Sequence, residues 1–285
     1  MDYAAQEYGN SGIRIRDVQL VALEILCEVD RVCRQHNIPY QLFAGTLLGA
    51  VRHQGFIPWD DDIDIAMLRP DMERFMGACK TDLSPCYFLQ TSETDPEYGN
   101  RYVKIRKEGT LFREYLAANR EIHHGIFIDI FCLDAVKPGT MAGKWQMLLL
   151  RLSRRLSAET YGQPDVMGYS GKTWMQKFSG LAEKMLGRRR LRRWDTRISR
   201  LFENESTPFV NHLQINASRE HCRRFLMSRG QFSETLMFTF EGHKFPGPAD
   251  YHALLTQAYG DYMKWPAENE RISRHPAIEV SLNHS

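Results

Sequence analysis

The feature that most constrains this chain is an alternation of acidic and apolar residues in WDDDIDIAM, residues 59–67. Four aspartates fall within five positions of this segment, and an apolar run follows at once. In a β-strand, Asp62 and Asp64 project from one face, while Ile63 and Ile65 project from the other. The segment therefore predicts a strand over residues 63–67 that buries its isoleucines and carries two carboxylates on the opposite face.

The crowded carboxylates indicate a metal site. Like charges this close repel and raise one another's pKa unless a cation lies between them, and Mg²⁺ prefers oxygen ligands. We expect a third ligand from Asp129, the one charged residue in the apolar strand GIFIDIF, residues 125–131. An unpaired charge in a buried strand is costly, and a metal or a hydrogen-bond partner would relieve that cost. A solvated acidic loop is the alternative interpretation.

A phosphate-binding turn is predicted upstream of the aspartates. Gly45 and Thr46 lie between a short predicted strand, residues 40–44, and a short predicted helix, residues 47–52. Backbone N–H groups at such a strand-to-helix turn are suited to phosphate. Gly-Thr by itself is a weak signal, but its combination with two acids on one strand and a third acid on another is much stronger.

Three basic residues are candidates for further phosphate contacts. Arg52 falls on the short helix, whereas Lys104 and Arg106 occupy alternate positions of a predicted strand over residues 102–107. Alternate positions share one face of a strand. A solvated strand face is the alternative interpretation for Lys104 and Arg106.

Hydrophobic periodicity predicts an α/β half followed by a mainly helical half. Apolar residues recur every three to four positions over residues 18–33, which is typical of an amphipathic helix. Residues 143–204 are also expected to be mainly helical. Other predicted elements are a helix opened by Pro70, a strand over 87–92, a short strand and turn over 235–248, and a helix over 248–260.

Composition excludes some functional classes. The chain has 285 residues and a formal net charge of +2, so no polyelectrolyte partner is implied. Its first residues lack the pattern of a secretory signal, and no apolar run is long enough to cross a bilayer. We therefore expect a soluble, cytoplasmic protein.

Positive charge is concentrated in residues 151–200, which contain 13 Lys or Arg against 4 Asp or Glu. Its densest part is GRRRLRRW, residues 187–194. A solvated helix face is one interpretation. The other is peripheral contact with an anionic membrane surface or an anionic lipid-linked glycan. No interleaving of aromatic and basic residues indicates an RNA-binding module, and we expect no nucleic-acid partner.

The segment GTLLGAVRHQGFIPWDDDIDIAM, residues 45–67, closely resembles the LicD family of the nucleotidyltransferase superfamily. That family includes bacterial phosphocholine transferases, and the fukutin-related proteins are distant relatives. Residues 102–110, 123–134 and 240–266 are also similar to it, so the resemblance extends from about residue 41 to 266 and is weakest over 141–235. The family strand usually continues Pro-Leu-Asp after FIDIF, and here Cys132 takes the place of that proline.

The resemblance implies a nucleotidyltransferase-like mixed sheet flanked by helices. It implies a catalytic core over residues 1–140, and a helical region over 141–285 that shapes the acceptor site and packs back on the core. Asp62, Asp64 and Asp129 would bind Mg²⁺ or Mn²⁺ and carry the catalysis. Gly45 and Thr46 would hold phosphate.

The implied reaction moves phosphocholine, or a related phospho-alcohol, from a CDP-linked donor such as CDP-choline. The acceptor would be a hydroxyl of a cell-surface glycan or its lipid-linked precursor, as in lipopolysaccharide or teichoic acid, and CMP would leave. Such an enzyme would work at the inner face of the cytoplasmic membrane. The alternative is a nucleotidyltransferase that moves a whole NMP group, because both reactions need the same neutralisation of phosphate charge. A binding protein that has lost the chemistry is a third hypothesis, although all three acids are present.

Five residues near these motifs have open roles. Packing is favoured for Trp59 over stacking on a choline headgroup, since aromatic residues carry large burial energies. Asp60 and Asp61 belong either to a supporting shell or to the turn before the strand. His123 and His124 are expected to be structural, with an active-site role as the alternative.

Overall fold

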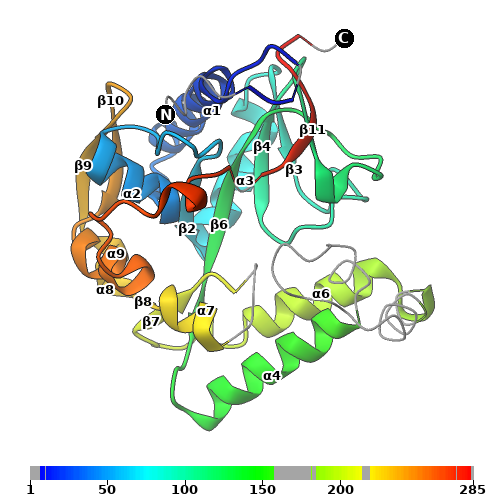
Figure 1. Cartoon of the computed structure of the whole chain (residues 1–285). Coiled ribbons are helices and arrows are strands. Elements are labelled where there is room, and N and C mark those ends of the chain that lie inside the picture. The colour runs from blue at the N-terminus through cyan, green and yellow to red at the C-terminus, as the bar shows by residue number, and fades with distance from the viewer. Residues whose placement is uncertain are drawn as a thin grey trace. The chain divides into compact units, whose positions relative to one another are not determined.

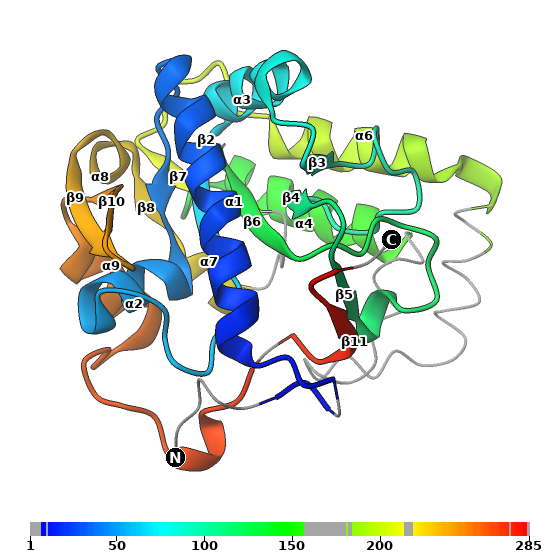
Figure 2. The same cartoon turned by 90° about the horizontal axis from the view of Figure 1, so that it is seen from above.

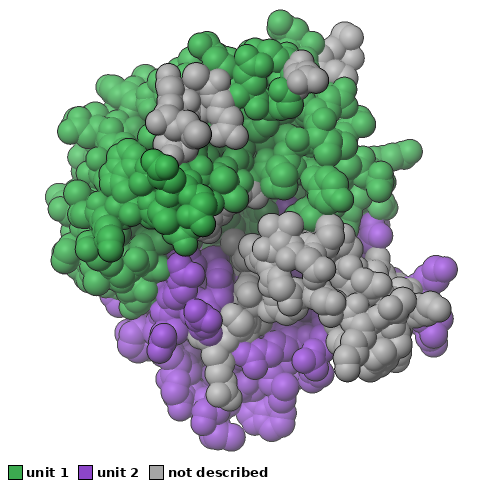
Figure 3. Space-filling model, viewed as in Figure 1, with its two compact units in different colours: residues 1–98, 102–132, 230–285 green, residues 99–101, 133–229 purple. Residues whose placement is uncertain are grey.

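The computed structural model describes residues 7–9, 11–156, 181, 184–213, 219–273 and 275–283. The chain forms two compact units, which are coloured separately in Figure 3. Unit 1 contains Met1–Tyr98, Tyr102–Cys132 and Gly230–Ser285, and unit 2 contains Gly99–Arg101 and Leu133–Arg229. These units differ from the predicted regions 1–140 and 141–285, because the last 56 residues, 230–285, are grouped with the N-terminal sheet.

Five strands form the main sheet of unit 1 in the order β1-β2-β6-β4-β3 (Figure 1). Their bounds are Gln41–Leu42 (β1), Asp64–Leu68 (β2), Tyr87–Gln90 (β3), Val103–Lys107 (β4) and Phe127–Val136 (β6). Strand β1 pairs antiparallel with β2, and β4 pairs antiparallel with β3 and β6. Strands β2 and β6 are neighbours, and the Asp129 N–H donates to the Ile63 carbonyl at 2.8 Å. This pairing places the acidic segment beside Asp129.

The helices of unit 1 follow the apolar patterns of the sequence. Their bounds are Ile15–Gln35 (α1), Ala44–His53 (α2), Arg69–Asp82 (α3) and Tyr251–Tyr259 (α9), with short 3₁₀ turns at Tyr115–Ala117 (η2) and Glu268–Glu270 (η4). Figure 2 shows α1 lying along one face of the sheet, where its apolar residues join a core that includes Ile63 and Ile65. Helix α2 begins at Ala44, three residues before the predicted start, so Gly45 and Thr46 lie in its first turn.

Two antiparallel strand pairs complete unit 1. Strands Thr235–Phe240 (β9) and His243–Pro248 (β10) pair antiparallel, as the sequence predicts for a strand and turn there. The helix Arg229–Ser233 (α8) precedes them. The strand Ala277–Ser281 (β11) pairs with Leu111–Glu114 (β5), which the sequence analysis does not predict. The pairing of β5 with β11 is important because it carries the C-terminal segment to the aspartates.

Unit 2 contains helices together with a small extension of β6. The predicted helical region 143–204 contains Met141–Arg155 (α4) and Arg188–Ser199 (α6), while residues 157–180 of that region lie outside the described residues. The other elements are Phe209–Asn211 (β7), Arg219–Arg224 (α7) and Met227–Ser228 (β8). Strand β7 pairs with residues 134–136 of β6 and with β8. The predicted α+β architecture is confirmed, and the C-terminal half combines its helices with these short strands.

Candidate metal and phosphate site

Three carboxylates converge where β2 begins. Asp62, Asp64 and Asp129 each offer a carboxylate oxygen, and these atoms all lie within 4.8 Å of one another. Ile63 and Ile65 are completely buried on the other side of the segment and fix it to the core. The alternation of acid and isoleucine therefore produces the local geometry that the sequence suggests, and the β2–β6 pairing supplies the third acid.

The proximity of these acids is electrostatically unfavourable without a cation. Burial raises the pKa of Asp64, and Asp62 and Asp129 raise it further. Burial also raises the pKa of Asp129, Lys104 lowers it and Asp62 raises it, which brings the value to about 6. Oxygen ligands that repel one another in this way fit a hard divalent cation such as Mg²⁺.

Lys104 is the counter-charge already present at this cluster. Its Nζ lies 2.9 Å from Asp129 Oδ1 and 3.7 Å from Glu114 Oε1, and the side chain is fully buried. The ammonium also lies 3.0 Å from the centroid of the Phe127 ring. Although Lys104 and Asp129 are at ion-pair distance, the two atoms do not have hydrogen-bond geometry. Asp129 Oδ1 is therefore still able to act as a metal ligand together with the carboxylates of Asp62 and Asp64.

Arg106 lies on β4, as Lys104 does, and it stabilises the position of Glu114. It is fully buried, and it donates to Gln90 Oε1 at 2.5 Å, to the Gly125 carbonyl at 2.6 Å and to Glu114 Oε2 at 3.2 Å. Burial would raise the pKa of Glu114, but Lys104 and Arg106 lower it to about 2. The alternative interpretation of Lys104 and Arg106 as a solvated strand face is wrong, because both side chains are fully buried.

Asp61 has a structural role that the sequence left open. This buried carboxylate accepts hydrogen bonds from Tyr8 Oη at 2.5 Å, from Ser273 Oγ at 2.7 Å and from His275 Nδ1 at 3.2 Å. It therefore ties segments from both ends of the chain to the acidic motif. Burial would lower the pKa of His275, but Asp62, Asp61 and Glu114 raise it well above its usual value, so this imidazole is cationic at neutral pH.

Asp60 faces the beginning of α2. A Cβ placed on Gly45 would lie 2.9 Å from Asp60 Oδ2, so the glycine permits this close approach. Burial, Asp62 and Asp61 all raise the pKa of Asp60. Thr46 is buried, and its Oγ1 accepts from the Asp64 N–H at 2.7 Å. Thr46 thereby positions one of the three central carboxylates, while phosphate binding by Gly45 and Thr46 stays a prediction.

Arg52 and Trp59 contact the loop that follows α9. Arg52 Nη1 donates to the Tyr262 carbonyl at 2.9 Å, and its guanidinium lies 5.9 Å from the Trp265 ring. Trp59 is 8% exposed and makes an edge contact with Trp265 at 5.6 Å. These contacts support the packing interpretation of Trp59, and phosphate contact by Arg52 stays a prediction.

The two neighbouring histidines have structural partners. His123 stacks on Phe88 with ring centroids 4.8 Å apart, and its Nε2 lies 3.2 Å from Glu108 Oε2. His124 Nε2 lies 3.0 Å from the Arg120 carbonyl oxygen. Burial lowers the pKa of His124, which favours its neutral form. The structural interpretation of both residues is therefore favoured over an active-site role.

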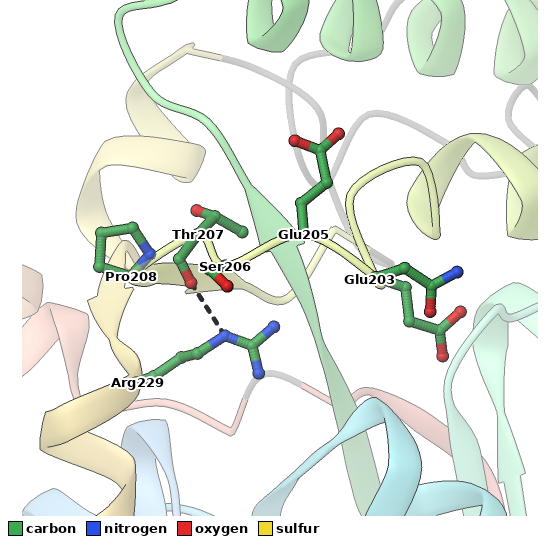
Figure 4. A pocket seen from close by; sticks show the side chains of 7 residues that line it. Glu203, Glu205, Ser206, Thr207, Pro208 and Arg229 are labelled. Atoms are coloured by element: carbon green, nitrogen blue, oxygen red, sulfur yellow. Dashed lines mark hydrogen bonds between the residues drawn. The ribbon is translucent and has the colours of Figure 1, made fainter.

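A separate surface pocket of about 570 Å³ lies in unit 2 (Figure 4). It is lined by residues 203–208 and Arg229, whose Nε donates to the Thr207 carbonyl at 3.0 Å. The lining contains none of the residues predicted for the metal or phosphate contacts. This pocket is therefore not part of the carboxylate cluster.

Three residues of the site were missed from the sequence, namely Glu114, His275 and Tyr8. Glu114 is the last residue of β5, whose four residues show no clear alternation of polar and apolar side chains. His275 is brought to Asp61 by the pairing of β11 with β5, which joins residues 277–281 to residues 111–114. No local sequence pattern indicates such a contact.

Comparison with known proteins agrees with this site. Residues 37–148 match the family described as LicD/FKTN/FKRP, nucleotidyltransferase domain, and this stretch contains Asp62, Asp64 and Asp129. The stretch that contains the three converging acids is therefore similar to the nucleotidyltransferase domain of that family.

The relatives extend the comparison beyond that domain. The chain is 28% identical to the lipopolysaccharide cholinephosphotransferase LicD of Haemophilus influenzae over 92% of this chain and 96% of that protein. It is also 41% identical to an uncharacterised protein of Rickettsia typhi over 22% of this chain and 20% of that protein. The similarity to LicD thus extends over almost the whole of both chains, whereas the match to the family model covers residues 37–148.

Proposed function

We propose that this protein transfers phosphocholine, or a related phospho-alcohol, from a CDP-linked donor to a glycan hydroxyl, releasing CMP. The acceptor is a cell-surface glycan or its lipid-linked precursor, as in lipopolysaccharide or teichoic acid. The convergence of Asp62, Asp64 and Asp129 carries the proposal. Similarity to the Haemophilus cholinephosphotransferase over almost the whole of both chains supports the choice of phosphocholine.

Mg²⁺ or Mn²⁺ held by Asp62, Asp64 and Asp129 would neutralise charge on the transferred phosphate and on the leaving CMP. The protein's own groups prepare this site. Thr46 fixes the backbone of Asp64, and Lys104 orients Asp129 from the buried side.

Asp129 is also the proposed base for the acceptor hydroxyl. Its place in the cluster supports this role, because one of its carboxylate oxygens lies within 4.8 Å of those of Asp62 and Asp64. Gly45, Arg52, Lys104 and Arg106 remain the proposed phosphate-binding residues besides Thr46. Because Lys104 and Arg106 are buried, they would act mainly through the field that they create at the acids.

We also propose that the enzyme acts at the cytoplasmic face of the membrane and contacts the membrane peripherally through residues 187–194. Helix α6 covers most of this stretch and exposes Arg189, Arg190 and Arg193. No helix in the described ranges is long and apolar enough to span a bilayer. Surface attraction to anionic lipid or to an anionic glycan precursor is the kind of contact that such arginines provide.

The test is a panel of CDP-alcohols with Mg²⁺ and a glycan acceptor, scored for CMP release and for the mass of the product. CDP-choline should release CMP and add the mass of phosphocholine to the acceptor. Asp64→Asn should abolish release, whereas the control Asp71→Asn, on α3, should retain it. A product that gains the mass of NMP would instead establish the alternative nucleotidyl transfer. Unchanged activity in Asp64→Asn would refute the catalytic assignment.

A further inference from the structure

Helix α4 in unit 2 presents an apolar stripe to solvent. Five large apolar side chains are exposed: Met141 by 65%, Trp145 by 58%, Leu148 by 42%, Leu149 by 39% and Leu152 by 46%. At about 100° per residue, these positions fall within an arc of roughly 100° on one side of the helix. Single exposed apolar residues are common, but a contiguous stripe of this kind marks a contact surface.

The opposite face of α4 holds the helix in place through polar contacts. Gln146 is buried and donates to the carbonyls of Ile198 at 3.1 Å and Ser199 at 3.2 Å. Arg154 is buried and donates to Asp195 of α6 at 3.1 Å. An ordinary surface helix buries its apolar stripe and exposes its polar side chains. Helix α4 also buries Leu150 in a small cluster with Val136 and Leu213, so the exposed stripe is a second apolar face of the helix.

The border of the stripe is basic. Lys144, Arg151 and Arg155 fall along one edge of the apolar arc, and α4 contains no Asp or Glu. Helix α6, which packs against α4, adds exposed arginines and the exposed Trp194. Tryptophan, leucine and arginine arranged in this way are characteristic of helices that lie in the interface of a bilayer.

We propose that α4 is a membrane-contact helix that lies flat in the interface of a bilayer containing anionic lipid. The apolar stripe enters the boundary between headgroups and acyl chains, and Lys144, Arg151 and Arg155 contact lipid phosphates. Anionic lipid is favoured over a second copy of the chain, because pairing two such faces would bring their basic borders together. This surface is additional to residues 187–194 and does not depend on the reaction at the aspartates.

Vesicle sedimentation of the full chain tests this surface. The wild-type protein should bind vesicles of phosphatidylcholine and phosphatidylglycerol, bind pure phosphatidylcholine at least tenfold more weakly, and lose binding as salt screens the charges. The double variant Leu148→Glu/Leu152→Glu should bind the mixed vesicles at least tenfold more weakly. The control variant Leu20→Glu changes a leucine of α1 that is 45% exposed, and it should bind the vesicles as the wild type does.

A charge variant separates the two parts of the surface. Arg151→Glu/Arg155→Glu should remove the preference for anionic vesicles, and circular dichroism and urea unfolding should show that each variant is folded. Wild-type binding in the double leucine variant, or no vesicle binding by the wild type, would overturn the proposal. Concentration-dependent dimers that the leucine variant abolishes, without vesicle binding, would assign the face to a second copy instead. CMP release is measured in parallel, so failure of the proposed reaction would be seen separately from failure of vesicle binding.

Discussion

Replacing Asp129 by asparagine should stabilise the metal-free protein while it removes the proposed activity. The carboxylate is buried, it faces Asp62, and its pKa lies at about 6 instead of 3.8 even though Lys104 lowers it. Asparagine has nearly the shape of the protonated acid but carries no charge. The substitution therefore removes a charge that the folded state disfavours and leaves the backbone of β6 unchanged.

The magnitude follows from the pKa. One pKa unit corresponds to about 1.4 kcal/mol, so ionised Asp129 costs the folded state about 3 kcal/mol relative to its protonated form. Between pH 3.8 and about 6, the folded protein holds a proton that the unfolded chain has lost. The contribution of Asp129 to the free energy of unfolding therefore falls as the pH rises through this window. The advantage of Asp129→Asn should be near zero below the window and reach about 3 kcal/mol above it.

Urea unfolding in EDTA at about pH 4 and about pH 8 measures this difference. In thermal unfolding at the higher pH, the melting temperature of the variant should lie about 6–12 °C above that of the wild type, at about 2–4 °C per kcal/mol. Mg²⁺ should stabilise the wild type and not the variant. The difference in the free energy of unfolding between the two proteins should therefore become smaller when the metal is added. Asp17→Asn is a control for which we expect a lower free energy of unfolding at about pH 8. Arg14 lowers the pKa of Asp17 by hydrogen bonding, so the ionised form of this residue stabilises the folded state. A variant no more stable than the wild type at about pH 8 would refute the electrostatic argument.

The remaining predictions concern the ion pair of Lys104 with Asp129 and the close backbone contact at Gly49, for which Gly77 provides the control. Lys104→Met removes the cation beside Asp129 and should lower the free energy of unfolding by about 3–5 kcal/mol at neutral pH, with a smaller loss when Asp129→Asn is also present. Equal losses in the two backgrounds would contradict the ion pair. Gly49→Ala places a Cβ 2.4 Å from the Gly55 carbonyl oxygen and should cost about 1–3 kcal/mol in urea unfolding. Gly77→Ala, in α3 with nothing within 4 Å of the new Cβ, should instead gain up to about 1 kcal/mol.

Much of the fold was predictable where one face of an element is buried. The apolar period over residues 18–33 predicts α1, and the alternation Asp62–Ile65 predicts the strand that became β2. Strand β5 and its partner β11 were not predicted. Each is short, and their pairing joins distant parts of the chain, so neither carries a local signal of the other. The compact units likewise depend on long-range packing of residues 230–285, which composition does not show.

The candidate site likewise has some residues whose role the sequence predicts and others whose role only the structure shows. Asp62, Asp64 and Asp129 could be selected from the sequence because an acid within an apolar strand needs a partner. The pattern also showed that Lys104 and Arg106 share a face, but it could not show that β4 is an inner strand. Only the packing of Glu114 and Phe127 against this face shows that these cations are buried rather than solvated.

The balance of charges around the cluster supports the divalent metal that we propose there. Six carboxylates gather there: Asp60, Asp61, Asp62, Asp64, Asp129 and Glu114. The facing cations are Lys104, Arg106 and the cationic form of His275. Arg106 donates to Glu114, and His275 is shared between Asp61 at 3.2 Å and Asp62 at 3.6 Å. Lys104 is likewise shared between Asp129 at 2.9 Å and Glu114 at 3.7 Å. Too little positive charge remains to neutralise Asp62, Asp64 and Asp129 together, and this excess of negative charge would attract a divalent cation. More buried cations would stabilise the metal-free protein, and they would also weaken the binding of the divalent metal that we propose for these three acids.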